Sequence, residues 1–231
     1  MEKVLDFGCG KGYFTNYLSN NYEAKGVDIN KNIIIEAKNL FSRPKYILLK
    51  SKKLPFKESF FDKVYCYDVL EHVDDLKSVL NEIKRVLKKD GILEIIIPYW
   101  KSEKFLSNIR SSYFKDIGHV RVFKKNELQK ILYKKSFEIK KVSKEQFIKN
   151  MELYLILKKE PLKSQFGDTE QEKSLLWRTF FHLFSKNLFR TPLKYFFFIW
   201  MFTLPFSLLM DNIFQKSVKI IAVKKWKWKN N

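Results

Sequence analysis

An apolar run that ends in an acid and then in alternating glycines begins almost at the start of the chain. Residues 4–7 predict a buried strand, and Gly8, Gly10 and Gly12 predict a tight turn that opens a helix. Glycine has no Cβ, so the backbone of such a turn can approach a ligand closely. The Gly-x-Gly-x-Gly spacing differs from the dinucleotide fingerprint, which argues against a nicotinamide enzyme. By itself the turn leaves a nucleotide-like ligand and a plain tight turn as equal alternatives.

Strand patterns alternate with helical patterns over the first hundred residues. The further expected strands are 23–29, 46–49, 63–67 and 92–97, and the expected helices are 12–20, 31–41 and 74–88. The segment 88–91, which ends in Gly91, should close the last of these helices. Five alternating strands predict an α/β fold with a Rossmann-like, doubly wound sheet, and a ligand at the carboxyl ends of its strands.

Asp28 ends the second expected strand, at the edge where the glycine turn lies. An acid at this place borders the crevice of an open α/β sheet and can accept hydrogen bonds from ribose hydroxyls. The alternative is an ordinary N-cap for the helix expected at 31–41. Because Asp28 accompanies the glycine turn, we favour the ribose role.

The order of several motifs resembles the class I S-adenosylmethionine-dependent methyltransferases, and most closely the group that includes the ubiquinone/menaquinone-type enzymes. The motifs are residues 4–12, Val27-Asp28, Leu54-Pro55-Phe56, Phe61-Asp62, residues 69–73, residues 87–91 and residues 118–123. A helix at 124–135 and a strand at 137–142 follow in the order that this family shows, and residues 217–226 suit its antiparallel last strand.

The resemblance implies S-adenosylmethionine as the cofactor. The matching residues are Asp6, Gly8, Gly10 and Gly12 around its methionine part, Asp28 at the ribose hydroxyls, Ile29 against the adenine, and Tyr67 and Asp68 near the reactive methyl group. The family often has an Asp where this chain has Lys50, placed for the adenine amine. An ammonium group cannot accept that hydrogen bond, so we expect Ser51 or backbone groups to serve instead.

His72 and His119 are the candidate catalytic bases for an acceptor that must lose a proton. The alternative for each is a structural histidine bonded to the backbone. Another alternative is that Glu71, beside His72, helps to bind a metal ion, as in some related quinone O-methyltransferases, although we expect no metal site. Cys9 and Cys66 read as small core residues in a reducing compartment, outside any disulfide.

Three regions are expected: a methyltransferase core at 1–146, an apolar helical insertion at 147–215, and a last strand with a basic tail at 216–231. The insertion is rich in aromatic residues and must pack somewhere. Its alternatives are a lid over an apolar acceptor, a membrane-facing surface, a homodimer contact and a plain extra layer. Its uncharged stretch, 195–210, is shorter than the roughly 20 residues that a membrane-spanning helix needs.

The basic charge is concentrated in the second half of the chain. Residues 101–231 contain 28 Lys and Arg against 11 Asp and Glu, which is +17 of the total of +20. This charge favours an anionic partner such as a lipid surface, a phosphorylated substrate or nucleic acid, whereas an AT-rich coding sequence is the plain alternative. No secretory signal precedes the first strand, so we expect a cytoplasmic protein, peripheral at the inner membrane face.

We therefore expect a methyltransferase that acts on oxygen or carbon of an apolar or lipid-linked small molecule. An RNA methyltransferase is one alternative, disfavoured because the sequence shows no recognisable RNA-binding module. A non-catalytic cofactor-binding or membrane scaffold protein is the other. It is raised by Lys50 and by the short segment before the glycine turn.

Overall fold

The computed structural model of the protein describes residues 1–109, 111–146 and 215–225. The chain divides into one unit of Met1–Glu145 with Lys216–Asn231 and a second unit of Gln146–Gln215. The expected insertion and its alternatives lie outside the described residues, apart from residue 215. The expected site residues all belong to the first unit.

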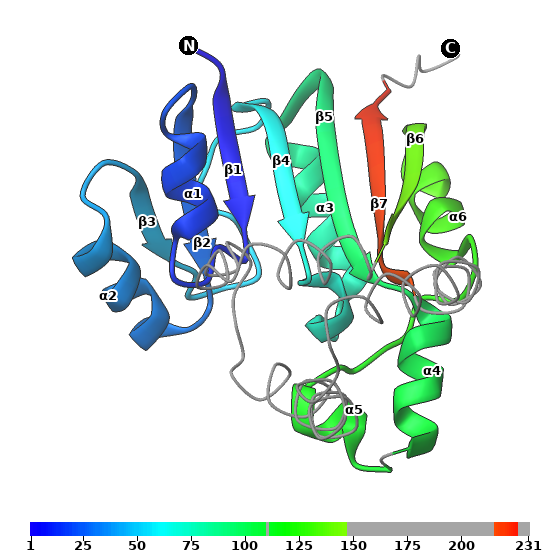
Figure 1. Ribbon diagram of the computed structural model, residues 1–231. Helices are drawn as coiled ribbons and strands as arrows, with labels where there is room; N and C mark the ends of the chain where they lie inside the picture. The colour runs from blue at the N-terminus through cyan, green and yellow to red at the C-terminus, as the bar shows by residue number, and fades with distance from the viewer. Residues whose placement is uncertain (110, 147–214, 226–231) are drawn as a thin grey trace, which may run out of the picture. The chain divides into compact units, whose positions relative to one another are not determined.

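Seven strands form one sheet in the order β3-β2-β1-β4-β5-β7-β6 (Figure 1). Their bounds are β1 (Lys3–Phe7), β2 (Glu23–Asp28), β3 (Lys45–Leu48), β4 (Phe61–Tyr67), β5 (Leu87–Pro98), β6 (Phe137–Gln146) and β7 (Gln215–Lys224). The first five strands pair in parallel, whereas β7 runs antiparallel to β5. The prediction of a doubly wound, mostly parallel sheet with an antiparallel last strand is confirmed.

The helices connect these strands. They are α1 (Tyr13–Leu18), α2 (Lys31–Leu40), the 3-10 helix η1 (Leu70–His72), α3 (Leu76–Val86), α4 (Trp100–Ile109), α5 (Tyr113–Ile117) and α6 (Glu127–Lys134). The predicted helices correspond to α1, α2, α3 and α6, whereas α4 and α5 were not predicted because their segment mixes charged, polar and aromatic residues without a clear apolar stripe. Among the described residues, no helix combines the length and apolar character that crossing a membrane requires.

Successive residues of β1 pack on opposite faces of the sheet. Val4 lies in a cluster with Leu18 of α1, whereas Leu5 belongs to the main core with Leu80 of α3. Figure 1 shows α1 in front of the sheet and α3 behind it. Burying one side chain of this size stabilises the fold by about 1.5 to 3 kcal/mol. The continuous apolar run of β1 is therefore explained by helices that cover both of its faces.

The prediction that residues 88–91 close a helix is wrong. Helix α3 ends at Val86, and Leu87 is already extended, with φ −71° and ψ 136°. The amide of Phe60 donates to the Val86 carbonyl at 2.8 Å, which aligns the chain with β4 at this point. Asp90 has a φ of 58°, and the register between β4 and β5 is irregular here. The turn residues thus form a bulge inside β5, because pairing with β4 takes the chain directly from helix to strand.

Candidate functional site

The turn after β1 is built from glycines in the left-handed region of φ. Gly8 has a φ of 81°, and a Cβ atom there would lie 2.2 Å from Cγ2 of Val69. The turn therefore lies directly against the segment that follows β4. Gly10 has a φ of 49°, and among the described residues, apart from its two chain neighbours, no atom lies within 4 Å of where its Cβ would be. The backbone at Gly10 thus faces open space that a ligand can occupy.

Asp28 joins the end of β2 to the glycine turn. One carboxylate oxygen accepts a hydrogen bond from the Gly10 amide at 3.1 Å, and the other accepts from the Asn30 amide at 2.9 Å. The N-cap of α2 is Asn30, so the N-cap alternative for Asp28 is wrong. A carboxylate has about four acceptor sites, which leaves room for a ribose hydroxyl. Ile29, predicted to contact the adenine, is 80% exposed beside it.

Asp6 is buried under the glycine turn. The residue is only 4% exposed, and its carboxyl group accepts a hydrogen bond from the Thr15 hydroxyl at 2.6 Å. Burial raises the pKa of Asp6 to about 7; the bond from Thr15 opposes that increase and the charge of Asp28 adds to it. A carboxyl group that titrates near neutral pH therefore lies beneath the predicted methionine site.

Tyr67 and Asp68 mark the end of β4. The Tyr67 hydroxyl donates to the carboxylate of Glu94 in β5, and Lys219 of β7 pairs with the same carboxylate. Burial raises the pKa of Tyr67 well above its usual range, and the bond to Glu94 adds to this, so the phenol stays protonated. Asp68 has a φ of 52°, and its amide donates to the Ile96 carbonyl at 3.0 Å. The sequence did not reveal Glu94 or Lys219, since only the sheet pairing brings them to Tyr67.

Ser51 lies in an exposed turn after β3. Its hydroxyl donates to the Lys53 carbonyl at 3.2 Å and accepts from the Lys53 amide at 3.3 Å. The Leu54-Pro55-Phe56 segment follows, and Arg85 of α3 donates to the Phe56 and Leu54 carbonyls at 2.8 and 3.0 Å. Arg85 was not predicted, and it holds this segment in place. The adenine role of Ser51 stays a prediction.

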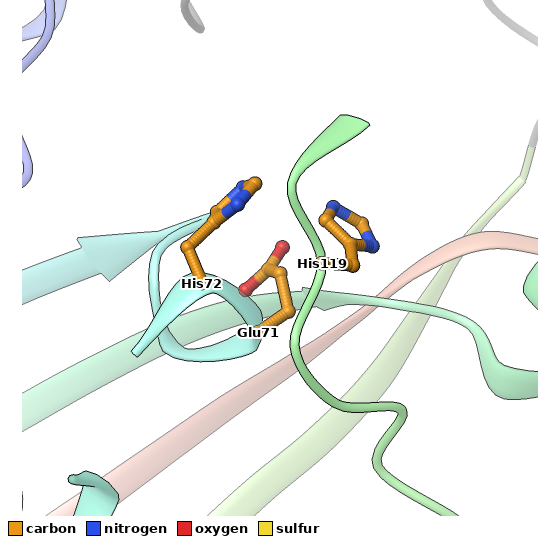
Figure 2. Close-up of side chains that lie close together, drawn as sticks. All are labelled: Glu71, His72 and His119. Atoms are coloured by element: carbon orange, nitrogen blue, oxygen red, sulfur yellow. The ribbon is translucent and has the colours of Figure 1, made fainter. Parts of the chain in front are cut away.

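Glu71, His72 and His119 form a second cluster, which we call the acid–imidazole cluster (Figure 2). One carboxylate oxygen and one nitrogen of each imidazole all lie within 4.8 Å of one another. The two rings are nearly perpendicular, at 79°, and their centroids are 4.6 Å apart. Glu71 is 1% exposed, whereas His72 is exposed. The fold thus brings the two predicted bases together and adds a buried carboxylate.

Backbone hydrogen bonds hold the two segments of this cluster together. The Val120 amide donates to the Glu71 carbonyl at 2.9 Å, and the Arg121 amide donates to the same carbonyl at 3.3 Å. The Arg121 guanidinium also donates to the carbonyls of Val73 and Asp74, the latter at 2.7 Å. The segment after α5 is therefore fastened to η1 at several points.

Each imidazole is oriented by a further partner. Nδ1 of His72 lies 3.0 Å from the Gly118 carbonyl oxygen. Nδ1 of His119 lies 2.6 Å from a carboxylate oxygen of Glu103, a residue of α4 that is 3% exposed. Glu103 was missed from the sequence because no motif surrounds it and it lies 16 residues from His119.

Residues 5–95 match a family model described as a methyltransferase domain. The match covers less than half of the chain, and the proteins of this domain family are class I S-adenosylmethionine-dependent methyltransferases. The cofactor of this domain family is S-adenosylmethionine. The fold agrees with the match. The glycine turn and strands β2, β3 and β4 lie within residues 5–95, and β6 and β7 extend the same sheet beyond them.

Two curated relatives and one solved structure illustrate the likeness. The chain is 42% identical over 94 residues to the uncharacterized protein MJ0638 of Methanocaldococcus jannaschii. The aligned segment covers 41% of this chain and 40% of that protein. It is 30% identical over 102 residues to the O-methyltransferase resE of Aspergillus sclerotiorum, covering 41% and 39% respectively. The crystal structure of YcgJ from Bacillus subtilis matches with a TM-score of 0.58 at 18% identity, over 98% of this chain and 93% of that one. The chain spans about two fifths of the length of these two curated relatives, and the structural likeness shows the fold.

Proposed function

We propose that the protein transfers the methyl group of S-adenosylmethionine to an oxygen or carbon atom of an apolar or lipid-linked small molecule. One observation carries the proposal: the open glycine turn lies directly against the segment that leads to the acid–imidazole cluster. Gly8 meets Val69, only two residues before Glu71. Groups for cofactor binding and for acceptor chemistry are therefore neighbours at the carboxyl ends of β1 and β4.

Methyl transfer from a sulfonium requires the acceptor atom in line with the methyl group. Such positioning can contribute about 7 to 11 kcal/mol to the lowering of the barrier. A hydroxyl or acidic carbon acceptor must also lose a proton, and the imidazoles of His72 and His119 are the groups with suitable chemistry. The carboxylate of Glu103 at Nδ1 of His119 would stabilise the imidazolium that accepts the proton.

The sequence of the insertion supports an apolar acceptor. Residues 175–210 contain 12 aromatic residues among 36, a density that exceeds the 16% of the whole chain. Aromatic side chains contribute large apolar contact areas to ligand sites. The basic second half supports an anionic membrane surface as a partner, with the protein at the cytoplasmic face.

Calorimetric titration of the full chain with S-adenosylmethionine and S-adenosylhomocysteine tests the cofactor step. We expect both to bind, and Asp28→Asn to weaken binding by about tenfold or more, since the substitution removes one charged acceptor. Glu23→Gln is the matched control, because Glu23 lies at the start of β2, away from the glycine turn, in an exposed ion pair with Lys25. Absence of binding to either compound by the unaltered protein would refute the proposal.

The acceptor class is tested by incubation with S-adenosylmethionine carrying a labelled methyl group. The panel contains phenols, quinols, sterols and membrane lipid extracts, with total RNA as the competing class. We expect the label in an extractable apolar product, together with S-adenosylhomocysteine. Label in RNA alone would replace the small-molecule acceptor by the RNA alternative that the basic charge also allows.

A further inference from the structure

We infer that Glu71, His72 and His119 bind one divalent first-row transition-metal ion, which keeps open positions for an oxygen atom of the acceptor. Metal binding is argued from the residues themselves, and the acceptor's part rests on the proposed function. The sequence predicted no metal site, because only the folded chain brings these three side chains together. Glu71 and His72 are adjacent in the sequence, whereas His119 lies 47 positions after His72, and the fold brings the three side chains to one point.

The donor set favours this class of ion. Two imidazoles and one carboxylate suit zinc, iron or cobalt with open positions, whereas magnesium and calcium prefer ligands that are all oxygen. Figure 2 shows the Glu71 carboxylate beside the rings of His72 and His119. Bond lengths of about 2.1 Å separate neighbouring ligand atoms by about 3 to 3.4 Å. From the observed limit of 4.8 Å, small side-chain rotations reach that separation.

The partners of the two imidazoles prepare them as ligands. The Gly118 carbonyl and the Glu103 carboxylate lie at Nδ1 of His72 and His119. When each neutral ring donates its Nδ1 hydrogen to that oxygen, Nε2 carries the lone pair. Metal-binding histidines are almost always oriented by a carbonyl or carboxylate in this way. Glu103 is therefore a positioning residue, which acts through His119.

The surroundings distinguish this site from a catalytic base alone. One oriented histidine would be enough for proton transfer, whereas here a second oriented imidazole and a carboxylate that is 1% exposed converge with it. A bound cation would offset the cost of burying the Glu71 carboxylate. The hydrogen bonds from Val120 and Arg121 to the Glu71 carbonyl fix the two segments before any ion arrives.

The ion would assist transfer to a hydroxyl acceptor. Coordination would lower the pKa of a bound hydroxyl, so its proton would pass to solvent water. His72 and His119 would then serve as ligands and not as the bases of a metal-free reaction. The acceptor oxygen then forms the new O–CH3 bond while the S–CH3 bond breaks. The bonding electron pair stays on sulfur, which becomes the neutral thioether of S-adenosylhomocysteine. On this view, oxygen is the methylated atom.

Metal binding is tested on the tag-free chain after it has been stripped with a chelator. Zn²⁺ binding is measured by calorimetry, and Co²⁺ binding by its visible absorption. We expect one equivalent of either ion, and no comparable binding of Mg²⁺. His72→Gln, His119→Gln and Glu71→Gln should each lower the affinity by more than tenfold. Glu103→Gln should lower it about 10- to 100-fold, which is the usual effect of losing a ligand's orienting partner.

Glu23→Gln is the control, because Glu23 lies at the start of β2 in an exposed ion pair with Lys25, and it should leave the affinity unchanged. X-ray absorption of the zinc-loaded unaltered protein should show two imidazoles and oxygen ligands, so the test survives a variant that fails to fold. No binding of either ion, unchanged affinity in the folded His72 and His119 variants, or sulfur ligation would overturn the inference. Because cofactor binding is titrated separately, loss of metal binding alone leaves the proposed function standing, and loss of cofactor binding alone leaves the metal site standing.

Discussion

Replacing Asp6 by Asn should change how the stability of the cofactor-free protein depends on pH. The pKa of Asp6 is raised from 3.8 to about 7 in the folded protein, mainly by burial. Between these values the native state keeps a proton that the unfolded chain releases, so the free energy of unfolding falls as pH rises. One pKa unit is worth about 1.36 kcal/mol, so the full effect is about 4 kcal/mol, of which about 2.6 kcal/mol falls between pH 5 and pH 8.

Urea denaturation of both proteins at pH 5 and pH 8 measures this effect. Asn can still accept the hydrogen bond that the Thr15 hydroxyl donates to Asp6. Relative to the unaltered protein, Asp6→Asn should therefore gain about 2.6 kcal/mol on going from pH 5 to pH 8. Other titrating groups cancel in that comparison. A stability difference that stays constant within about 0.5 kcal/mol would show that Asp6 is already ionised in the native state, and the reasoning from burial would fail.

Two further predictions concern the glycine turn and the basic half of the chain. Gly8→Ala should destabilise the protein by several kcal/mol, because the new methyl group meets Val69 and the φ of 81° is strained for alanine. Gly10→Ala should lower the free energy of unfolding by only about 1 to 2 kcal/mol and mainly weaken cofactor binding. Thermal denaturation and calorimetry separate the two effects, and equal loss of stability would contradict the assignment of open space at Gly10. The full chain should float with vesicles that contain anionic lipid and release them as salt is raised, since residues 101–231 carry a net charge of +17. Failure to float with both anionic and neutral vesicles would remove the membrane proposal.

Much of the fold was predictable because its signals are local. Apolar runs, glycines at alternate positions and an acid at the end of a strand are read within a few residues of one another. The parallel pairing of the first five strands follows from the general rules for alternating strands and helices, whereas their order in the sheet comes from the structure. An error arose where two local outcomes are equally open. Residues 88–91 suit a helix end as well as a bulge, and only the pairing with β4 decides between them.

The residues of the candidate site also differ in whether the local sequence could reveal them. Local pattern alone places the glycine turn and Asp28 at one edge of a parallel sheet, because the carboxyl ends of parallel strands meet there. Only the tertiary structure joins Glu71 to His119 and Glu103 to His119, since hydrogen bonds between η1 and the segment after α5 close those gaps. Asp6 and Glu71 are buried because several elements pack around them, and this burial raises the pKa of Asp6. No short stretch of sequence contains that information.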